Sequence, residues 1–337
     1  MDFFLLIYRS NDFPDPYYNK WEAIIANLQG LILSKRLRGV IDRLPVLSTA
    51  GLEHDSEWRR AYSLLCFMAH SYIWGGDSPE ENLPPSITVP LLHISNYLEV
   101  PPVATYAAVC LWNFKPLFAD ENVDNLENLA TLTTFTGSID ESWFYLVSVA
   151  IEARAAPVLP SCLQQLSGSH RNIAQLVKKK DAASESEAEG SAPRTKHNFL
   201  LEMRKYMPGA HRRFLEDMTV VANIRDYVEA HTDNHELCLA YDACLAMLRT
   251  FRDKHIAIVT RYIVIKSRET RSHSRSMSPE ATRSRKVDIA TASRGRGDDE
   301  EKRRKLKGTG GTALIPFLKQ ARDETGEPTI DSWARRL

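Results

Sequence analysis

The stretch FRDKHIAIVTRYIVI, residues 251–265, is the most informative part of the chain, because it places a histidine inside an apolar helical pattern. Alternating steps of four and three residues, the spacing of one helix face, connect a set that we call the apolar seam. Its members are Leu237, Tyr241, Cys244, Leu248, Phe251, His255, Ile258, Tyr262 and Ile265. We expect this face to be buried. His255 would then be either a hydrogen-bonded core residue or a ligand to a metal or haem iron.

Helical spacing also dominates the rest of the sequence, and strand-like alternation is nearly absent. Proline, glycine and polar residues mark where the expected helices begin and end. The pattern predicts helical structure over 17–47, a helix over 55–75 stopped by Gly75 and Gly76, one over 101–114 that starts at Pro101 and Pro102, and one from Asp140 or Ser142 to 166. The predicted fold class is all-α.

The composition is that of an ordinary globular protein that can bury a pocket. The 337 residues include 43 basic and 43 acidic side chains, so the formal charge is zero and indicates neither a nucleic acid nor a membrane partner. Five cysteines without a C-x-x-C pair favour a reducing compartment, which predicts a cytoplasmic protein. The apolar N-terminus MDFFLLIY is too short for a signal peptide, and no run is long enough for a membrane helix.

Two low-complexity segments interrupt the helical pattern. Residues 178–197 contain no large apolar side chain and are typical of a linker. Residues 267–307 are rich in arginine and serine, with thirteen basic and seven acidic side chains. We expect a solvated surface loop there, and binding to RNA or a role in nuclear import is the alternative.

Three further motifs invite a functional interpretation. The stretch GTGGT (308–312) lacks the order of a phosphate loop and predicts a glycine turn, which lets the backbone approach another group closely. His231 and His235 have the spacing of a metal-binding pair, but no third ligand is near and a polar helix start is the alternative. His70 lies in an apolar helix and competes with His255 for any haem role.

Several long segments resemble, in the same order, those of indoleamine 2,3-dioxygenases, haem enzymes that open the indole ring of tryptophan. They include SYIWGG (71–76), LEVPPVATYAAVCLWNF (98–114), SWFYLVSVAIEARAAPVLP (142–160), FLLEMRKYMPGAHRRFLEDM (199–218), LAYDACLAMLRTFRDKHIAIVTRYIVI (239–265) and KGTGGTALIPFLKQARDET (307–325). The resemblance covers most of the chain. It implies a monomeric, two-domain helical haem protein. The expected domains are a small N-terminal domain over 1–119 and a haem-binding catalytic domain over 120–337.

The resemblance also implies a haem b site. The family's proximal ligand lies in an R-x-x-H segment that matches Arg252 to His255, so His255 would bind the iron. Arg252, Gly310 and Gly311 are assigned to the same cofactor site. His70 then becomes a core residue.

The implied substrate is L-tryptophan or a related indoleamine, which reacts with dioxygen to give N-formylkynurenine in the first step of the kynurenine pathway toward NAD. Phe144 would stack against the indole, and Ser148 would offer a hydroxyl near the dioxygen or the indole nitrogen. Tyr106 and Thr312 would line the pocket. Core spacing of Tyr106 and Phe144 leaves ordinary helix packing as the alternative.

The chain departs from the family between residues 166 and 199. There the family has further helices, an arginine that pairs with the substrate carboxylate and a Gly/Ser/Ala-rich loop near the haem, and none of these is recognisable here. Arg171 and Arg194 lie in the stretch without a matching motif. The sequence fits a shortened form or a divergent member with poor tryptophan turnover. The alternatives are a catalytically impaired haem protein and an all-α interaction scaffold that uses the Arg/Ser-rich loop.

Overall fold

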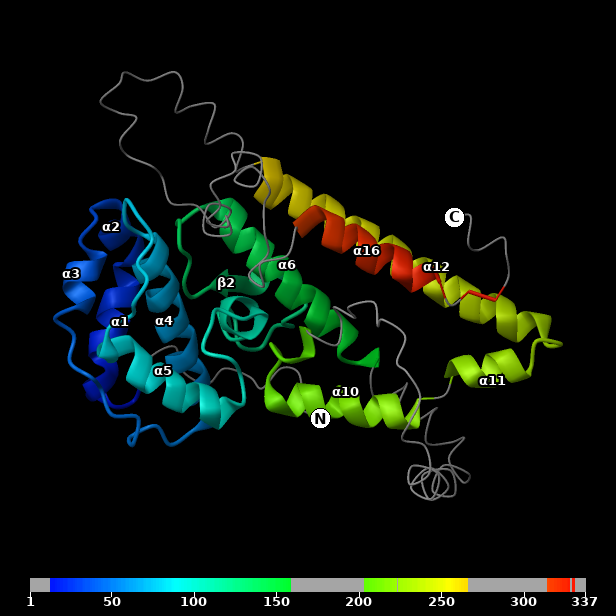
Figure 1. Ribbon diagram of the computed structural model, residues 1–337, viewed down its shortest axis with the longest axis horizontal. Coiled ribbons are helices and arrows are strands. Elements are labelled where there is room, and N and C mark those ends of the chain that lie inside the picture. The colour runs from blue at the N-terminus through cyan, green and yellow to red at the C-terminus, as the bar shows by residue number, and fades with distance from the viewer. Residues whose placement is uncertain (1–12, 159–202, 223, 266–313, 328, 331–337) are drawn as a thin grey trace, which may run out of the picture.

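The computed structural model describes residues 13–158, 203–222, 224–265, 314–327 and 329–330. Both low-complexity segments, the glycine turn at 308–312 and the arginines Arg171 and Arg194 lie outside these residues. Figure 1 shows the helices of the described chain. Their bounds are α1 Asn19–Ala26, α2 Leu28–Leu33, α3 Leu37–Ile41, α4 Asp55–Trp74, α5 Pro85–Leu98, α6 Ile139–Ala155, α10 Gly209–Val221, α11 Ile224–Ala230, α12 His235–Val259 and α16 Leu314–Gly326.

Short elements join these helices. They are the 3-10 turns η1 Pro16–Tyr18 and η3 Leu126–Asn128, the π-helical turns η2 Ala107–Leu111 and η4 Thr260–Ile265, and the strands β1 Phe114–Pro116 and β2 Leu129–Thr131. The two strands pair antiparallel, with Lys115 opposite Ala130, and form the one sheet among the described residues. The prediction of an all-α fold is therefore confirmed.

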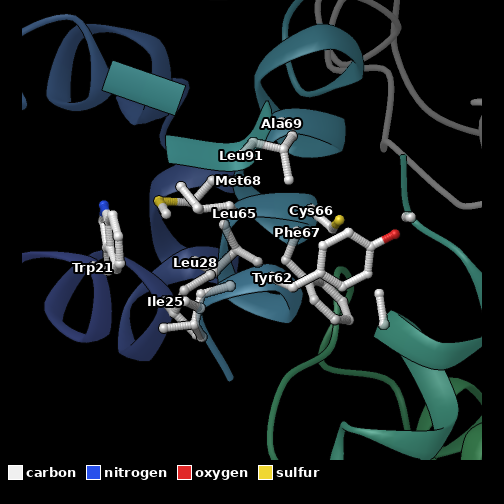
Figure 2. Packing of buried hydrophobic residues seen from close by; sticks show 14 of the residues in the cluster. Trp21, Ile25, Leu28, Tyr62, Leu65, Cys66, Phe67, Met68, Ala69 and Leu91 are labelled. Carbon is white, nitrogen blue, oxygen red and sulfur yellow. The ribbon is translucent and has the colours of Figure 1, made fainter. Parts of the chain in front are cut away.

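Helix α4 forms the centre of the N-terminal part. Apolar residues surround it on nearly all sides, as expected of a helix inside a core. Its end at Gly75 agrees with the prediction, and the Gly75 N–H donates to the Ser71 carbonyl. Figure 2 shows Leu65 and Met68 of this helix in the same buried cluster as Trp21 of α1 and Leu91 of α5. This core cluster extends in sequence from Phe13 to Ala150, so it includes residues on both sides of the expected domain boundary, which stays a prediction.

The predicted helix over 101–114 is wrong in its extent. Only the π-helical turn η2 forms, and the residues before it run irregularly along α4. The hydroxyl oxygen of Tyr62 lies 2.8 Å from the carbonyl oxygens of both Pro101 and Val103. The Ala104 N–H donates to Nε2 of His70 at 3.2 Å. These bonds to α4 occupy backbone groups that a helix would have paired with one another.

Helix α12 packs against α16. The two run antiparallel, since later residues of the α16 segment pair with earlier residues of α12. Ion pairs connect Arg322 with Asp253 at 3.1 Å and Arg249 with Asp323 at 3.8 Å. Near the start of α12, the buried Asp242 carboxylate accepts the Ile330 N–H at 2.9 Å. The pair is therefore held by polar contacts along its length.

The predicted burial of the apolar seam is wrong. Phe251 is 49% exposed and Leu248 is 44% exposed, and His255 and Cys244 are exposed as well. Helix α16 covers a different face of α12, the one that includes Asp242. Helical spacing shows which residues share a face, but the position of the neighbouring helix decides which face is covered.

Ion pairs connect α10 with the N-terminal part of the molecule. Helix α10 is joined to the C-terminal end of α5, because Glu99 pairs with Arg213 and with Arg212. Among the residues that the structure describes, no helix is long and apolar enough to cross a membrane.

Candidate functional site

His255 lies in the last turns of α12 with its ring accessible from the surface. The protein around it is still dense enough that desolvation lowers its pKa, and the positive charge of Arg252 lowers this pKa further. Both effects favour the neutral imidazole, which has a free lone pair for a metal. An accessible, neutral histidine surrounded by protein has the properties required of a ligand to a cofactor that lies against α12.

Arg252 lies one turn before His255. Its Nε is buried and has no hydrogen-bond partner among the described residues. A buried donor without an acceptor costs free energy, so such a group in a folded protein calls for an explanation. A carboxylate on a bound cofactor, such as a haem propionate, would supply the acceptor. This donor and the neutral histidine fit haem, although no cluster of three metal-binding side chains occurs in the described residues.

The beginning of α6 is fixed by a buried carboxylate. Ser138 caps the helix by accepting the Glu141 N–H at 3.3 Å. The Glu141 side chain accepts the backbone N–H groups of Phe135 and Thr136, each at 2.8 Å, and the Tyr145 hydroxyl at 2.9 Å. These bonds anchor the first turns of α6 to the preceding loop and so determine where its later side chains lie.

Phe144 and Ser148 follow one another on a partly accessible face of α6. The Ser148 hydroxyl donates to the Phe144 carbonyl at 3.1 Å. Beside them Tyr106, 45% exposed, donates its hydroxyl to Oε1 of Glu152 at 3.2 Å. Desolvation, Cys110 and Glu152 raise the pKa of Tyr106, while a hydrogen bond with Ser148 lowers it. The predicted pocket residues Tyr106, Phe144 and Ser148 are thus neighbours.

The predicted haem ligand lies on α12 and two predicted substrate residues lie on α6, and these helices are connected through η4. Helix α6 contacts η4, the turn that continues α12 beyond His255. In Figure 1 this end of α12 lies beside α6. The structure therefore brings the helix of His255 to the helix of Phe144 and Ser148. Gly310, Gly311 and Thr312 lie outside the described residues, and the site assignments as a whole stay predictions.

The other histidines have local explanations. His70 accepts the Ala104 N–H through Nε2, and burial lowers its pKa, as suits a neutral core residue. His231 lies in the turn after α11, and His235 is the first residue of α12, where Asn234 accepts the Leu237 N–H at 3.1 Å. No metal pair is needed to explain it.

Sequence reasoning missed two acidic residues of α6. Glu141 was not singled out, although a capping position close to a helix start was a usable signal. Glu152 was missed as well. Its position four residues after Ser148, on the same helix face, could have pointed to it.

Comparison with known proteins decides the family. The family model described as Indoleamine 2,3-dioxygenase matches residues 4–184 and 176–328. The chain belongs to the indoleamine 2,3-dioxygenase family. It is 35% identical to an indoleamine 2,3-dioxygenase of Saccharomyces cerevisiae, over 91% of this chain and 87% of the relative. An indoleamine 2,3-dioxygenase of Aspergillus nanangensis is 32% identical, over 93% of this chain and 90% of the relative.

A third relative differs in its printed substrate. It is a 6-hydroxytryptophan 2,3-dioxygenase of Fusarium equiseti, 30% identical over 93% of this chain and 92% of its own length. These relatives confirm the predicted family and the prediction of a dioxygenase enzyme.

The comparisons also bear on the middle of the chain. The family model matches in two segments that overlap at 176–184. The alignment with the Aspergillus relative runs over 394 positions, more than the 337 residues of this chain. This relative therefore contains residues that have no counterpart here. That they belong between residues 166 and 199 of this chain stays a prediction.

Proposed function

We propose that this protein is a haem-dependent dioxygenase that opens the indole ring of L-tryptophan or a related indoleamine. The observation that carries the proposal is the pair on α12, a neutral and accessible His255 one turn after the buried, unpartnered Nε of Arg252. The family's printed names support the substrate class. The enzyme would act in the cytoplasm at the first step of the kynurenine pathway.

Four residues of the chain would bind the cofactor. His255 would bind the iron, and Arg252 would donate to an acidic group at the edge of the haem. Gly310 and Gly311 would allow close approach of the backbone. When bound, haem b supplies the activation of dioxygen, and the protein supplies orientation and a dry surrounding.

The α6 face would position the substrate. Phe144 would stack on the indole ring, and the Ser148 hydroxyl would lie near the dioxygen or accept the indole N–H. Tyr106 and Thr312 would complete the wall and limit access of water. Both atoms of dioxygen enter across the C2–C3 bond of the indole, so that L-tryptophan gives N-formylkynurenine without a side-chain general base.

The missing middle segment supports a second candidate, a haem-binding relative with impaired tryptophan turnover. Loss of a charge-assisted bond to the substrate carboxylate forfeits about 1.5–3 kcal/mol, or roughly ten- to a hundred-fold in affinity. We therefore expect slow turnover of L-tryptophan and little preference for it over indoles that lack the carboxylate.

Isotope incorporation tests the function directly. The haem-loaded full chain is incubated with reductant, L-tryptophan or tryptamine, and dioxygen labelled with oxygen-18, and products are analysed by mass spectrometry. We expect a ring-opened product that contains two labelled oxygen atoms. Haem-loaded protein that forms no such product from either indole would overturn the dioxygenase assignment and leave the impaired relative.

A further inference from the structure

Glu152 is a half-buried carboxylate on α6 that has no cationic partner among the described residues. Within the part of the chain that the structure describes, no ion pair involves it, whereas the nearby Arg154 pairs with Asp124 at 3.3 Å. The Tyr106 hydroxyl donates to its carboxylate at 3.2 Å. A neutral phenol offsets only part of a carboxylate's charge, so the site still favours a positive group.

The carboxylate lies next to the predicted indole position. Phe144, Ser148 and Glu152 follow one another at intervals of four residues, which places them on one face of α6. Helical side chains lean toward the N-terminus of their helix, so the Glu152 side chain extends toward Ser148. The Tyr106 hydroxyl reaches the Glu152 carboxylate, and the Ser148 hydroxyl reaches the Phe144 carbonyl at 3.1 Å, so these side chains lie along one stretch of the α6 surface.

We propose that Glu152 binds the ammonium group of the substrate and thereby makes this chain prefer aminoethyl indoles such as tryptamine. The proposal rests on the proposed function, since it takes the α6 face as the indole site. The face would then present, in order, an aromatic ring for the indole, a hydroxyl for its N–H and a carboxylate for its ammonium group. Tyr106 orients that carboxylate through its hydroxyl.

Charge explains why the preferred ligand would lack a carboxylate. The amino acid tryptophan carries its carboxylate on the same carbon as its ammonium group, so binding at Glu152 would bring two negative charges together. The motif around the arginine that pairs with the substrate carboxylate in the family is not recognisable between residues 166 and 199 of this sequence. An indole with an ammonium group alone makes the same favourable contact without this repulsion.

Calorimetric titration of the haem-loaded full chain tests the proposal with three probes: tryptamine, L-tryptophan and indole-3-propionate, which has no ammonium group. We expect tryptamine to bind most tightly to the wild type. Glu152→Gln should weaken tryptamine binding about tenfold or more, because it replaces a charged hydrogen bond with a neutral one. The same variant should bind indole-3-propionate as well as the wild type or better.

Two further variants control the result. Glu127→Gln removes an exposed carboxylate from η3 and should change no affinity. Glu152→Asp keeps the charge and should retain more of the tryptamine affinity than Glu152→Gln. If Glu152→Gln keeps its haem spectrum and binds tryptamine as tightly as the wild type, the role of Glu152 is wrong while the proposed function stands. If the wild type binds none of the three indoles, both are overturned.

Discussion

At the scale of single residues, His255 and Arg252 are coupled through charge. The pKa of His255 lies below its ordinary value because of burial first and the Arg252 guanidinium second. In the haem-free protein, Arg252→Gln should therefore raise the His255 pKa toward the ordinary value of about 6.5. The measurement is an NMR titration of the imidazole ring protons.

Arg249→Gln is the matched control, because Arg249 pairs with Asp323 on the α16 side of α12. It should leave the His255 titration nearly unchanged. An unchanged His255 pKa in Arg252→Gln would contradict the charge coupling between these two side chains and weaken the assignment of both to one cofactor site.

His70 predicts a pH dependence of folding. Burial lowers its pKa in the folded state, so the unfolded chain binds more protons between that lowered value and about 6.5. Its contribution to stability is therefore complete above about pH 6.5 and is lost as the pH falls toward the folded pKa. His70→Gln, which keeps an acceptor for the Ala104 N–H, should flatten this part of the profile.

Urea unfolding of the haem-free protein between pH 7.5 and pH 5 measures this difference. The wild type should lose more stability than His70→Gln over this interval. Equal losses in the two proteins would mean that His70 titrates in the folded state as it does in the unfolded one.

At the scale of elements, the apolar seam shows what helical spacing can and cannot predict. The period predicted one long helix through His255, and α12 is that helix. It could not predict that α16 covers another face, because that depends on a segment more than fifty residues further along the chain. The face that was expected to be buried is the one left accessible beside His255.

The exposure of the apolar seam has a measurable consequence in the haem-free protein. Phe251→Ser should cost less than about 1 kcal/mol of unfolding free energy, since the ring is already half exposed. Phe67→Ser in α4 should cost about 3–5 kcal/mol, because that ring is fully buried. Urea unfolding provides both values, and similar losses for the two variants would show that the seam is covered after all.

Local signals account for the elements that the sequence predicted well. Helix α4 ends at its glycine, and α6 begins at Ile139, one residue before Asp140, the earlier of the two expected starts. The helix prediction for 101–114 was wrong in its extent, because the conformation of this segment depends on hydrogen bonds with Tyr62 and His70, some 35 to 40 residues earlier in the chain. Hydrogen bonds of that kind leave no periodic trace in the segment itself.

At the scale of the whole molecule, the fold class and family followed from the sequence, and the relation between the two helices of the site did not. Helix α6 belongs to the N-terminal core cluster, and α12 belongs to the pair with α16. Their contact through η4 brings Phe144 and Ser148 toward the helix of His255. Spacing within either helix carries no information about such a contact between them.

The visible spectrum of the haem-reconstituted protein tests the central claim, that His255 is the haem ligand of this dioxygenase, most directly. Wild type, His255→Ala and His70→Ala are compared after removal of free haem, with circular dichroism to confirm equal helix content. We predict a strong Soret band for the wild type and for His70→Ala, and loss of the band for His255→Ala. A band that persists in His255→Ala and disappears in His70→Ala would contradict the assignment, and no band in the wild type would contradict haem binding altogether.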